Sequence, residues 1–228
     1  MQGKSQSTVT LLAVDTTSRR ESVAVLRADQ LLGAVHLECP DTHSRRVLPA
    51  AAFLLQTLGL GPQDLDGFAV AVGPGSFTGL RVGLSTVQGL ALGTGRPCVG
   101  VSALDAVAWQ ARGTGATLAV MLDAGRGEVF AGLYSADGTP QGAGSRAAPR
   151  AFVEQAPSSS CFVGEGAWRY GDVVRAAHPQ ARVLRGSEFL AEAVGRIGVQ
   201  RLASGEGRPA ASLRPLYLRE VHIRGRDT

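Results

Sequence analysis

The sequence predicts an α/β protein made of two lobes with similar element order, and three observations support this. Residues 9–111 contain three successive strands followed by alternating helices and strands, the order of a ribonuclease-H-like lobe. A weaker copy of this order follows in residues 112–228. Each copy opens with a strand that ends at an aspartate, Asp15 or Asp123. Two such lobes form the fold of the actin-like ATPase superfamily (sugar kinases, Hsp70 and actin); here the second lobe is reduced, and its tail can return to the first.

Apolar runs and helical spacing define the elements of the first lobe. The expected strands cover residues 9–14, 21–28, 31–39, 68–72 and 97–101. A first helix is expected to start at Pro40-Asp41-Thr42 and to end before Gly59, with a kink or a short first turn at Pro49. A second helix follows the strand at 68–72, and a third covers residues 103–111.

The second helix follows the motif Gly-Pro-Gly-Ser-Phe-Thr-Gly at residues 73–79. Ser76 or Thr78 is expected to cap its first turn. Its buried stripe is predicted to consist of residues spaced i, i+4, i+7 and i+11, namely Leu80, Leu84, Val87 and Ala91. Glycines recur along the helix, and each interior glycine costs about 1 kcal/mol against alanine. The small residues therefore indicate close packing against another helix, in this chain or in a partner.

The glycine motif fits none of the common catalytic or nucleotide-binding loops. A P-loop needs a lysine before the helix, a dinucleotide-binding loop needs closer glycine spacing, and a nucleophile elbow needs glycine where Pro74 stands. An anion site at the start of the helix, near Arg81, stays open. A tight strand-to-helix turn explains the same glycines.

Composition narrows the chemistry further. The chain has 228 residues, a formal net charge of +4 and a sequence pI of about 9.4. Lys4 is its only lysine, so Schiff-base chemistry and lysine phosphate clamps are not expected. The three cysteines, Cys39, Cys98 and Cys161, are far apart and indicate a reducing compartment. With no signal-like or membrane-spanning run, the sequence predicts a cytoplasmic protein.

The second lobe is predicted with strands at 118–122, 127–134 and 162–164 and helices at 168–177 and 189–202. Residues 138–160 show little pattern. The turns Asp15-Thr16-Thr17 and 123–128 are candidate phosphate turns, since hydroxyls suit phosphate and aspartate suits Mg²⁺. Asp15 and Asp123 are expected to face one cleft. Ordinary turn chemistry explains the same residues, and no glycine-rich adenosine loop follows Asp123, so any nucleotide cleft is expected to be vestigial.

Metal binding by histidine is not expected, because no two histidines are three or four residues apart.

Several segments of the sequence together resemble the TsaB (YeaZ) family. They are Leu-Ala-Val-Asp-Thr-Thr at 12–17, His-Ser-Arg-Arg-Val-Leu-Pro at 43–49, the glycine motif extended to Gly83, Gln-Gly-Leu-Ala-Leu-Gly at 88–93, Leu-Asp-Ala at 122–124 with Gly-Glu-Val at 127–129, and Pro-Leu-Tyr-Leu-Arg at 215–219.

The resemblance implies an accessory protein of bacterial tRNA threonylcarbamoyladenosine biosynthesis, without catalysis of its own. Such proteins pair with a metal-binding catalytic paralogue, and an ATPase is the third component. In the catalytic relatives a His-x-x-x-His motif follows the strand that corresponds to residues 99–101; here residues 102–107 hold no histidine. The alternatives are an ATP-dependent phosphotransferase or ATPase of the same fold and, disfavoured by the missing histidines, an M22-like metallopeptidase.

The resemblance and the glycine positions together predict the partner surface. The helix after Asp41 and the helix after Thr78 are expected to bind the paralogue or, when the chain is alone, a second copy of it. The residues expected to carry this contact are His43, Arg46, Val47, Thr78, Arg81, Val82, Gly83, Thr86 and Gly89. The chain is expected to need no cofactor, apart from weak or shared ATP or ADP with Mg²⁺ at the partner interface, and to meet tRNA only within the complex.

Overall fold

The computed structural model describes residues 8–38 and 45–218. These residues form two compact units, each with its own sheet. The first unit comprises the chain up to Ala106 together with Phe189–Leu216. The second comprises Val107–Glu188 and the last described residues. Each unit is described by itself below.

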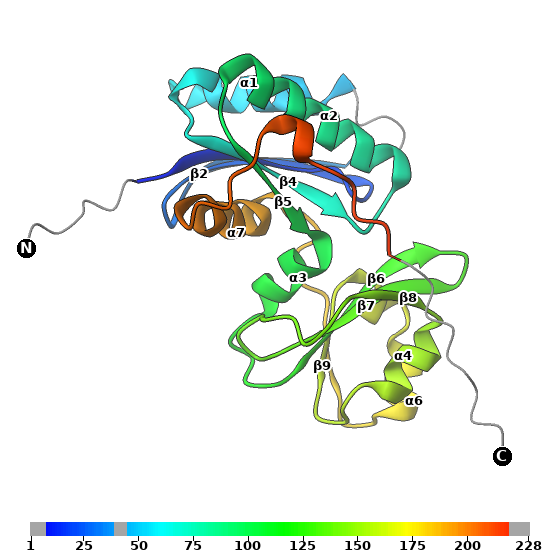
Figure 1. The fold of residues 1–228 in the computed structure, drawn as a ribbon. Helices are drawn as coiled ribbons and strands as arrows, with labels where there is room; N and C mark the ends of the chain where they lie inside the picture. Colours follow the sequence, from blue (N-terminus) through cyan, green and yellow to red (C-terminus); the bar gives the residue numbers. More distant parts are fainter. Residues whose placement is uncertain (1–7, 39–44, 219–228) are drawn as a thin grey trace, which may run out of the picture. The chain divides into compact units, whose positions relative to one another are not determined.

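The sheet of the first unit has the strand order β3-β2-β1-β4-β5. Its strands are β1 (Thr10–Asp15), β2 (Arg20–Arg27), β3 (Gln30–Glu38), β4 (Gly67–Gly73) and β5 (Cys98–Ser102). β1 pairs antiparallel with β2 and parallel with β4. Figure 1 shows α1 (Val47–Thr57) and α2 (Phe77–Thr94) on one face of this sheet and α7 (Ala191–Ala203) on the other. Short 3-10 turns, Pro62–Asp64 and Ala210–Ser212, complete the unit, and α3 (Ala103–Ala111) leads out of it.

The central strand β1 is buried on both faces because its side chains alternate between two helical layers. Leu12 and Val14 belong to the core under α1 and α2. On the opposite face, Leu11 and Ala13 lie against α7, whose Gly195 and Gly198 leave room for them. The predicted stripe of α2 is confirmed, since its four residues are all buried. Ser76 is the N-cap, and its hydroxyl accepts the N–H of Gly79 at 3.2 Å.

The division into units differs from the expected boundary at residue 111. The helix expected at 189–202 in the second lobe is α7, which packs on β1, β2, β4 and β5 of the first unit. A Cβ at Gly195 would lie 2.1 Å from Leu26 Cδ1, and one at Gly198 would lie 2.6 Å from Ala69 Cβ. Glycine therefore lets the helix backbone approach the sheet, whose second face would otherwise expose apolar side chains.

The sheet of the second unit has the order β10-β9-β6-β7-β8 and repeats the pairing of the first. Its strands are β6 (Leu118–Gly125), β7 (Glu128–Tyr134), β8 (Ser145–Ala147), β9 (Cys161–Val163) and β10 (Arg182–Leu184). β6 pairs antiparallel with β7 and parallel with β9, as β1 does with β2 and β4. The predicted second copy of the fold is thereby confirmed.

Sequence patterns missed three short elements of the second unit. They are β8, β10 and the helix α4 (Pro149–Gln155). Segments of three to seven residues are too short for a period to emerge. The single helix expected at 168–177 is two helices, α5 (Glu165–Arg169) and α6 (Gly171–Ala177), which meet at Tyr170.

Candidate functional site

The turn after β1 surrounds Asp15, whose side chain is completely buried. Its Oδ1 accepts hydrogen bonds from the Thr17 backbone N–H at 3.0 Å and from the Thr17 hydroxyl at 2.7 Å. The other oxygen, Oδ2, accepts no hydrogen bond of normal geometry from the described residues. The backbone N–H of Leu190 lowers the pKa of Asp15, but less than either group of Thr17 does. Desolvation by burial dominates and raises the pKa of Asp15 to about 6.

The first turn of α2 packs directly on this Asp15 turn. The Ser76 N–H donates to the Thr17 carbonyl at 2.7 Å, and the Thr16 hydroxyl donates to the Gly79 carbonyl at 2.7 Å. A Cβ at Gly79 would lie 2.0 Å from the Thr16 carbonyl oxygen, and one at Gly75 would lie 2.3 Å from that of Thr17. The glycines of the motif are thus accounted for by close backbone packing at a tight strand-to-helix turn.

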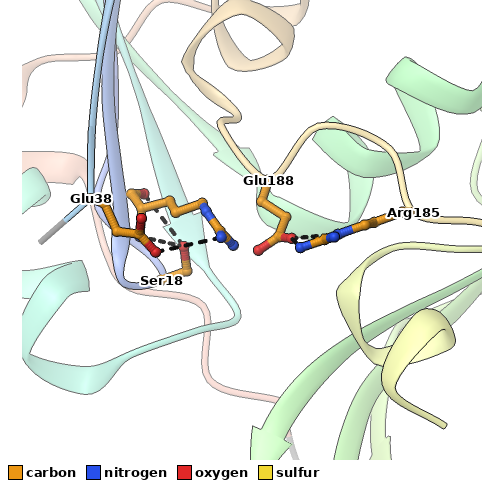
Figure 2. A network of polar contacts seen from close by, with 5 residues as sticks. Ser18, Glu38, Arg185 and Glu188 are labelled. Carbon is orange, nitrogen blue, oxygen red and sulfur yellow. Dashed lines mark hydrogen bonds and ion pairs between the residues drawn. The ribbon is translucent and has the colours of Figure 1, made fainter. Parts of the chain in front are cut away.

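The polar residues at the start of β2 hold the other end of the same turn. The Ser18 hydroxyl accepts the Arg20 N–H at 3.0 Å, and Arg20 forms an ion pair with Glu38 of β3 at 3.5 Å. Figure 2 shows Ser18 and Glu38 at this end of the turn. In the second unit, Arg185 pairs with Glu188 at 2.9 Å (Figure 2).

Two of the residues expected at the partner surface lie in the core instead. Gly83 is buried, and a Cβ there would lie 2.5 Å from the Thr16 hydroxyl oxygen. Val47, the first residue of α1, is 1% exposed and belongs to the core of the first unit. The expectation that Gly83 faces outward is therefore corrected: this glycine makes room for Thr16. His43 lies outside the described residues.

The other predicted contact residues reach the surface. Thr78, Arg81 and Gly89 are exposed, and Val82 and Thr86 are half-buried. Together with Ser85, Leu92 and Gly93 they form the outer face of α2. A shallow hollow of about 380 Å³ lies along it, lined by Phe77, Thr78, Arg81, Val82, Ser85 and Thr86. Arg46, the residue that precedes α1, is also exposed.

Large exposed apolar side chains on these two helices were not predicted. Leu92 is 80% exposed and Phe77 is 55% exposed on α2, while Phe53 and Leu48 are 63% and 51% exposed on α1. The Arg81 guanidinium lies 3.9 Å from the centre of the Phe77 ring. A signal existed in the sequence, because Leu92 and Phe77 fall outside the buried stripe of α2.

The corresponding turn of the second unit holds Asp123 in a different environment. Asp123 Oδ2 pairs with Arg169 at 2.9 Å, and its Oδ1 accepts the Gly125 N–H at 3.3 Å. Gly125, Arg126 and Gly127 all have positive φ, so the turn is tight. That Asp15 and Asp123 face a common cleft stays a prediction.

Across residues 8–38 and 45–218, no three His, Cys, Asp or Glu side chains are grouped as metal ligands would be. In the same part of the chain, no helix has both the length and the apolar character needed to cross a bilayer.

Comparison with known proteins places the chain in a family. A family model described as TsaD, tRNA N6-adenosine threonylcarbamoyltransferase, matches residues 28–153. The tRNA threonylcarbamoyladenosine biosynthesis protein TsaB of Escherichia coli (strain K12) is 34% identical over 222 residues, which are 92% of this chain and 94% of that protein.

Solved structures agree. YeaZ from Pseudomonas aeruginosa superposes with a TM-score of 0.78 at 32% identity, over 92% of this chain and 100% of that one. The activator of 2-hydroxyisocaproyl-CoA dehydratase from Clostridium difficile superposes with a TM-score of 0.53 at 8% identity, over 92% of this chain and 100% of that one. The latter likeness concerns the fold alone. The predicted two-lobe α/β fold of the actin-like ATPase superfamily is confirmed, and the chain belongs to the TsaB (YeaZ) family.

Proposed function

We propose that this chain is a non-catalytic partner subunit in the threonylcarbamoylation of the tRNA adenosine next to the anticodon. It binds and activates a metal-binding, TsaD-type catalytic paralogue. An ATPase is the third component, and the chain meets tRNA in the cytoplasm through this complex. Alone, it forms a homodimer through the same surface. The names of the matched relatives support the pathway, and the outer face of α2 supports the role of a partner.

The observation that carries the proposal is the pairing of small and large apolar residues on this face. Thr78, Val82, Ser85, Gly89 and Leu92 follow one another at spacings of three and four residues, the repeat at which two helices stay in contact. A Cβ at Gly89 or Gly93 would meet nothing within 4 Å, so a partner backbone can approach closely there. Stable interfaces bury about 1,600 Å² in total, which two helices per partner can supply.

The Asp15 turn supports a role without nucleotide chemistry in this chain. The N–H and hydroxyl of Thr17, which a phosphate would need, are both held by Asp15 Oδ1. The Asp15 carboxyl is fully buried, whereas a bound Mg²⁺ usually keeps several water molecules, for which this turn leaves no room. These residues do not fit a Mg-nucleotide, so no step of the proposed function passes through one here. ATP hydrolysis by the purified chain, abolished by Asp15→Asn, would favour the phosphotransferase alternative.

The decisive experiment adds bulk to the outer face of α2. Gly89→Leu places a side chain in open space and removes a helix-weakening glycine, so the fold is expected to persist. Binding to the paralogue and homodimerisation should both fall at least tenfold, as size-exclusion chromatography with light scattering would measure. Modification of tRNA in the reconstituted system should fall in parallel.

The matched control is Gln200→Leu, which adds an equal apolar side chain to the exposed surface of α7 in the same unit. It should leave dimerisation, paralogue binding and tRNA modification unchanged. Should Gly89→Leu keep its circular dichroism spectrum and still bind the paralogue as the wild type does, the partner surface lies elsewhere. Gly83→Leu is unsuitable for this test because the residue is buried against Thr16.

A further inference from the structure

A pocket in the first unit lies beside β5, and none of its lining residues belongs to the Asp15 turn or to the outer face of α2. β5 is the edge strand of its sheet, and residues 204–216 fold back along it. The pocket has a volume of about 330 Å³. Its polar and charged lining residues include Arg201, Arg208, Arg214, Glu206 and Ser212. We call it the edge pocket.

The wall of the edge pocket is held in place by hydrogen bonds at several points. The backbones of Cys98 and Arg208 exchange two bonds of 2.9 Å, and the Leu216 N–H donates to the Val72 carbonyl at 2.7 Å. The Gln88 side chain of α2 donates to the Ala210 carbonyl at 3.2 Å. The returning segment is therefore anchored to β5, β4 and α2.

Positive charge dominates the lining of the edge pocket. Arg201 is held by the Gly100 carbonyl at 2.6 Å and by Asp105 at 3.3 Å. Arg214 donates to two backbone carbonyls, at 2.5 and 2.8 Å, and no carboxylate of the described residues pairs with it. Among the described residues, Arg208 forms no ion pair, and neither does Glu206, the one acidic lining residue.

The backbone of β5 adds a donor of fixed direction. The N–H and C=O of Cys98 point away from β4, because both bond to Arg208. Two residues on, the Gly100 carbonyl accepts from Arg201, so the Gly100 backbone points the same way and its N–H faces the edge pocket. Sheet edges with outward N–H groups form anion-binding concavities. Burial raises the pKa of the Cys98 thiol, which therefore adds no negative charge to the lining.

We propose that the edge pocket binds a phosphate group through the guanidinium groups of Arg208 and Arg214 and the N–H of Gly100. Arginine forks match phosphate oxygens in pairs, and such charge-assisted bonds are about twice as strong as neutral ones. Arg201, fixed by the Gly100 carbonyl and paired with Asp105, forms part of the wall of the site. The phosphate comes from an RNA backbone or from a free nucleotide. This inference does not depend on the partner role proposed above.

The test compares Arg208→Glu and Arg214→Glu with Arg96→Glu in the full chain. Arg96 is exposed, donates to the Gln63 carbonyl and does not line the edge pocket, so its variant matches the change in charge. Inorganic phosphate and AMP are titrated while the amide resonance of Gly100 is followed by nuclear magnetic resonance. An unmodified tRNA transcript is titrated by fluorescence anisotropy at several salt concentrations.

The Gly100 amide is expected to shift with phosphate in the wild type and in Arg96→Glu. Binding should weaken about tenfold or more in the two pocket variants, the effect of losing one charge-assisted hydrogen bond. If tRNA binding weakens as well, with a salt slope reduced by about one, the site takes an RNA phosphate. If only phosphate and AMP weaken, it takes a free nucleotide.

The proposal is overturned if the Gly100 amide does not respond to phosphate, or if the pocket variants bind every probe as Arg96→Glu does. Arg208→Gln keeps the backbone bonds between Cys98 and Arg208 and removes the charge. It serves as the second variant should a charge reversal lower the thermal stability.

Discussion

Asp15 ends the first strand of one sheet and Asp123 lies two residues before the end of the first strand of the other, and although the two sheets share their topology, the surroundings of the two aspartates differ. Asp15 is fully buried and holds both polar groups of Thr17. Asp123 keeps a side chain that is 16% exposed and pairs with Arg169. The two positions in the fold correspond. Complete burial raises the pKa of Asp15, whereas the less buried Asp123 forms an ion pair. A topological position therefore does not by itself define a ligand site.

The glycines of the helices that pack against these two strands also differ in the part of the chain that they contact. In the first unit, Gly75 and Gly79 bring α2 into contact with the carbonyls of Thr17 and Thr16. In the second, a Cβ at Gly164 would lie 2.5 Å from the Met121 carbonyl oxygen, within β6 and before the turn. Glycine serves close packing in both units, but only in the first does it seal the turn that carries the aspartate.

The largest effect is expected from adding a methyl group where α2 meets the Asp15 turn. Gly79→Ala would bring its Cβ to 2.0 Å from the Thr16 carbonyl oxygen, a backbone atom that cannot easily move. We expect a loss of about 3 kcal/mol or more in the free energy of unfolding, as for other overpacked sites. Urea denaturation measures this. Gly89→Ala, on the open face of the same helix, should instead stabilise by up to about 1 kcal/mol; equal effects at the two positions would contradict the packing described here.

Asp15→Asn should change the free energy of unfolding by an intermediate amount, and it should raise the stability where Gly79→Ala lowers it. The Asn oxygen can accept both bonds from Thr17, and the desolvated negative charge disappears. Because the folded pKa of about 6 exceeds the ordinary aspartate pKa of 3.8, which the unfolded chain has, the folded state binds more protons between pH 4 and pH 6. The wild type should thus lose stability as the pH rises through 6, whereas the variant should not.

At pH 8 Asp15→Asn should be more stable than the wild type by about 1–3 kcal/mol, and the two should converge near pH 4. The difference between their unfolding free energies, measured in urea from pH 4 to 8, isolates this one group from the other carboxyls. A variant that is less stable at pH 8 would mean that the ionised carboxylate is itself held by the fold.

The smallest effect is expected at the other aspartate. Asp123→Asn removes a partly exposed ion pair with Arg169, which is worth about 0–1 kcal/mol and weakens with added salt. Thermal unfolding at low and at high salt measures this, and an effect as large as that of Gly79→Ala would show that the two turns are more alike than their burial indicates.

The sequence by itself determined the order of elements from β1 to β7, the presence of a second sheet with the same start, and the buried stripe of α2. These depend on local periodicity and on Ser76 as a cap, which act over a few residues. It also carried the segments by which the TsaB family is identified. It did not reveal β8, β10 or the break at Tyr170, because elements of three to seven residues show no measurable period.

Only the tertiary structure decided which way each glycine of α2 faces and which sheet α7 covers. Gly83 and Gly89 are equivalent in sequence pattern, yet one meets Thr16 and the other meets open space. Likewise, the burial of Asp15 depends on contacts such as that between Thr16 and Gly79, which are 63 residues apart. Arg208 is brought beside β5 by its contact with Cys98, 110 residues away, and Arg201 and Arg214 line the same pocket. Contacts between such distant segments depend on the packing of whole layers, and no local pattern of residue types encodes them.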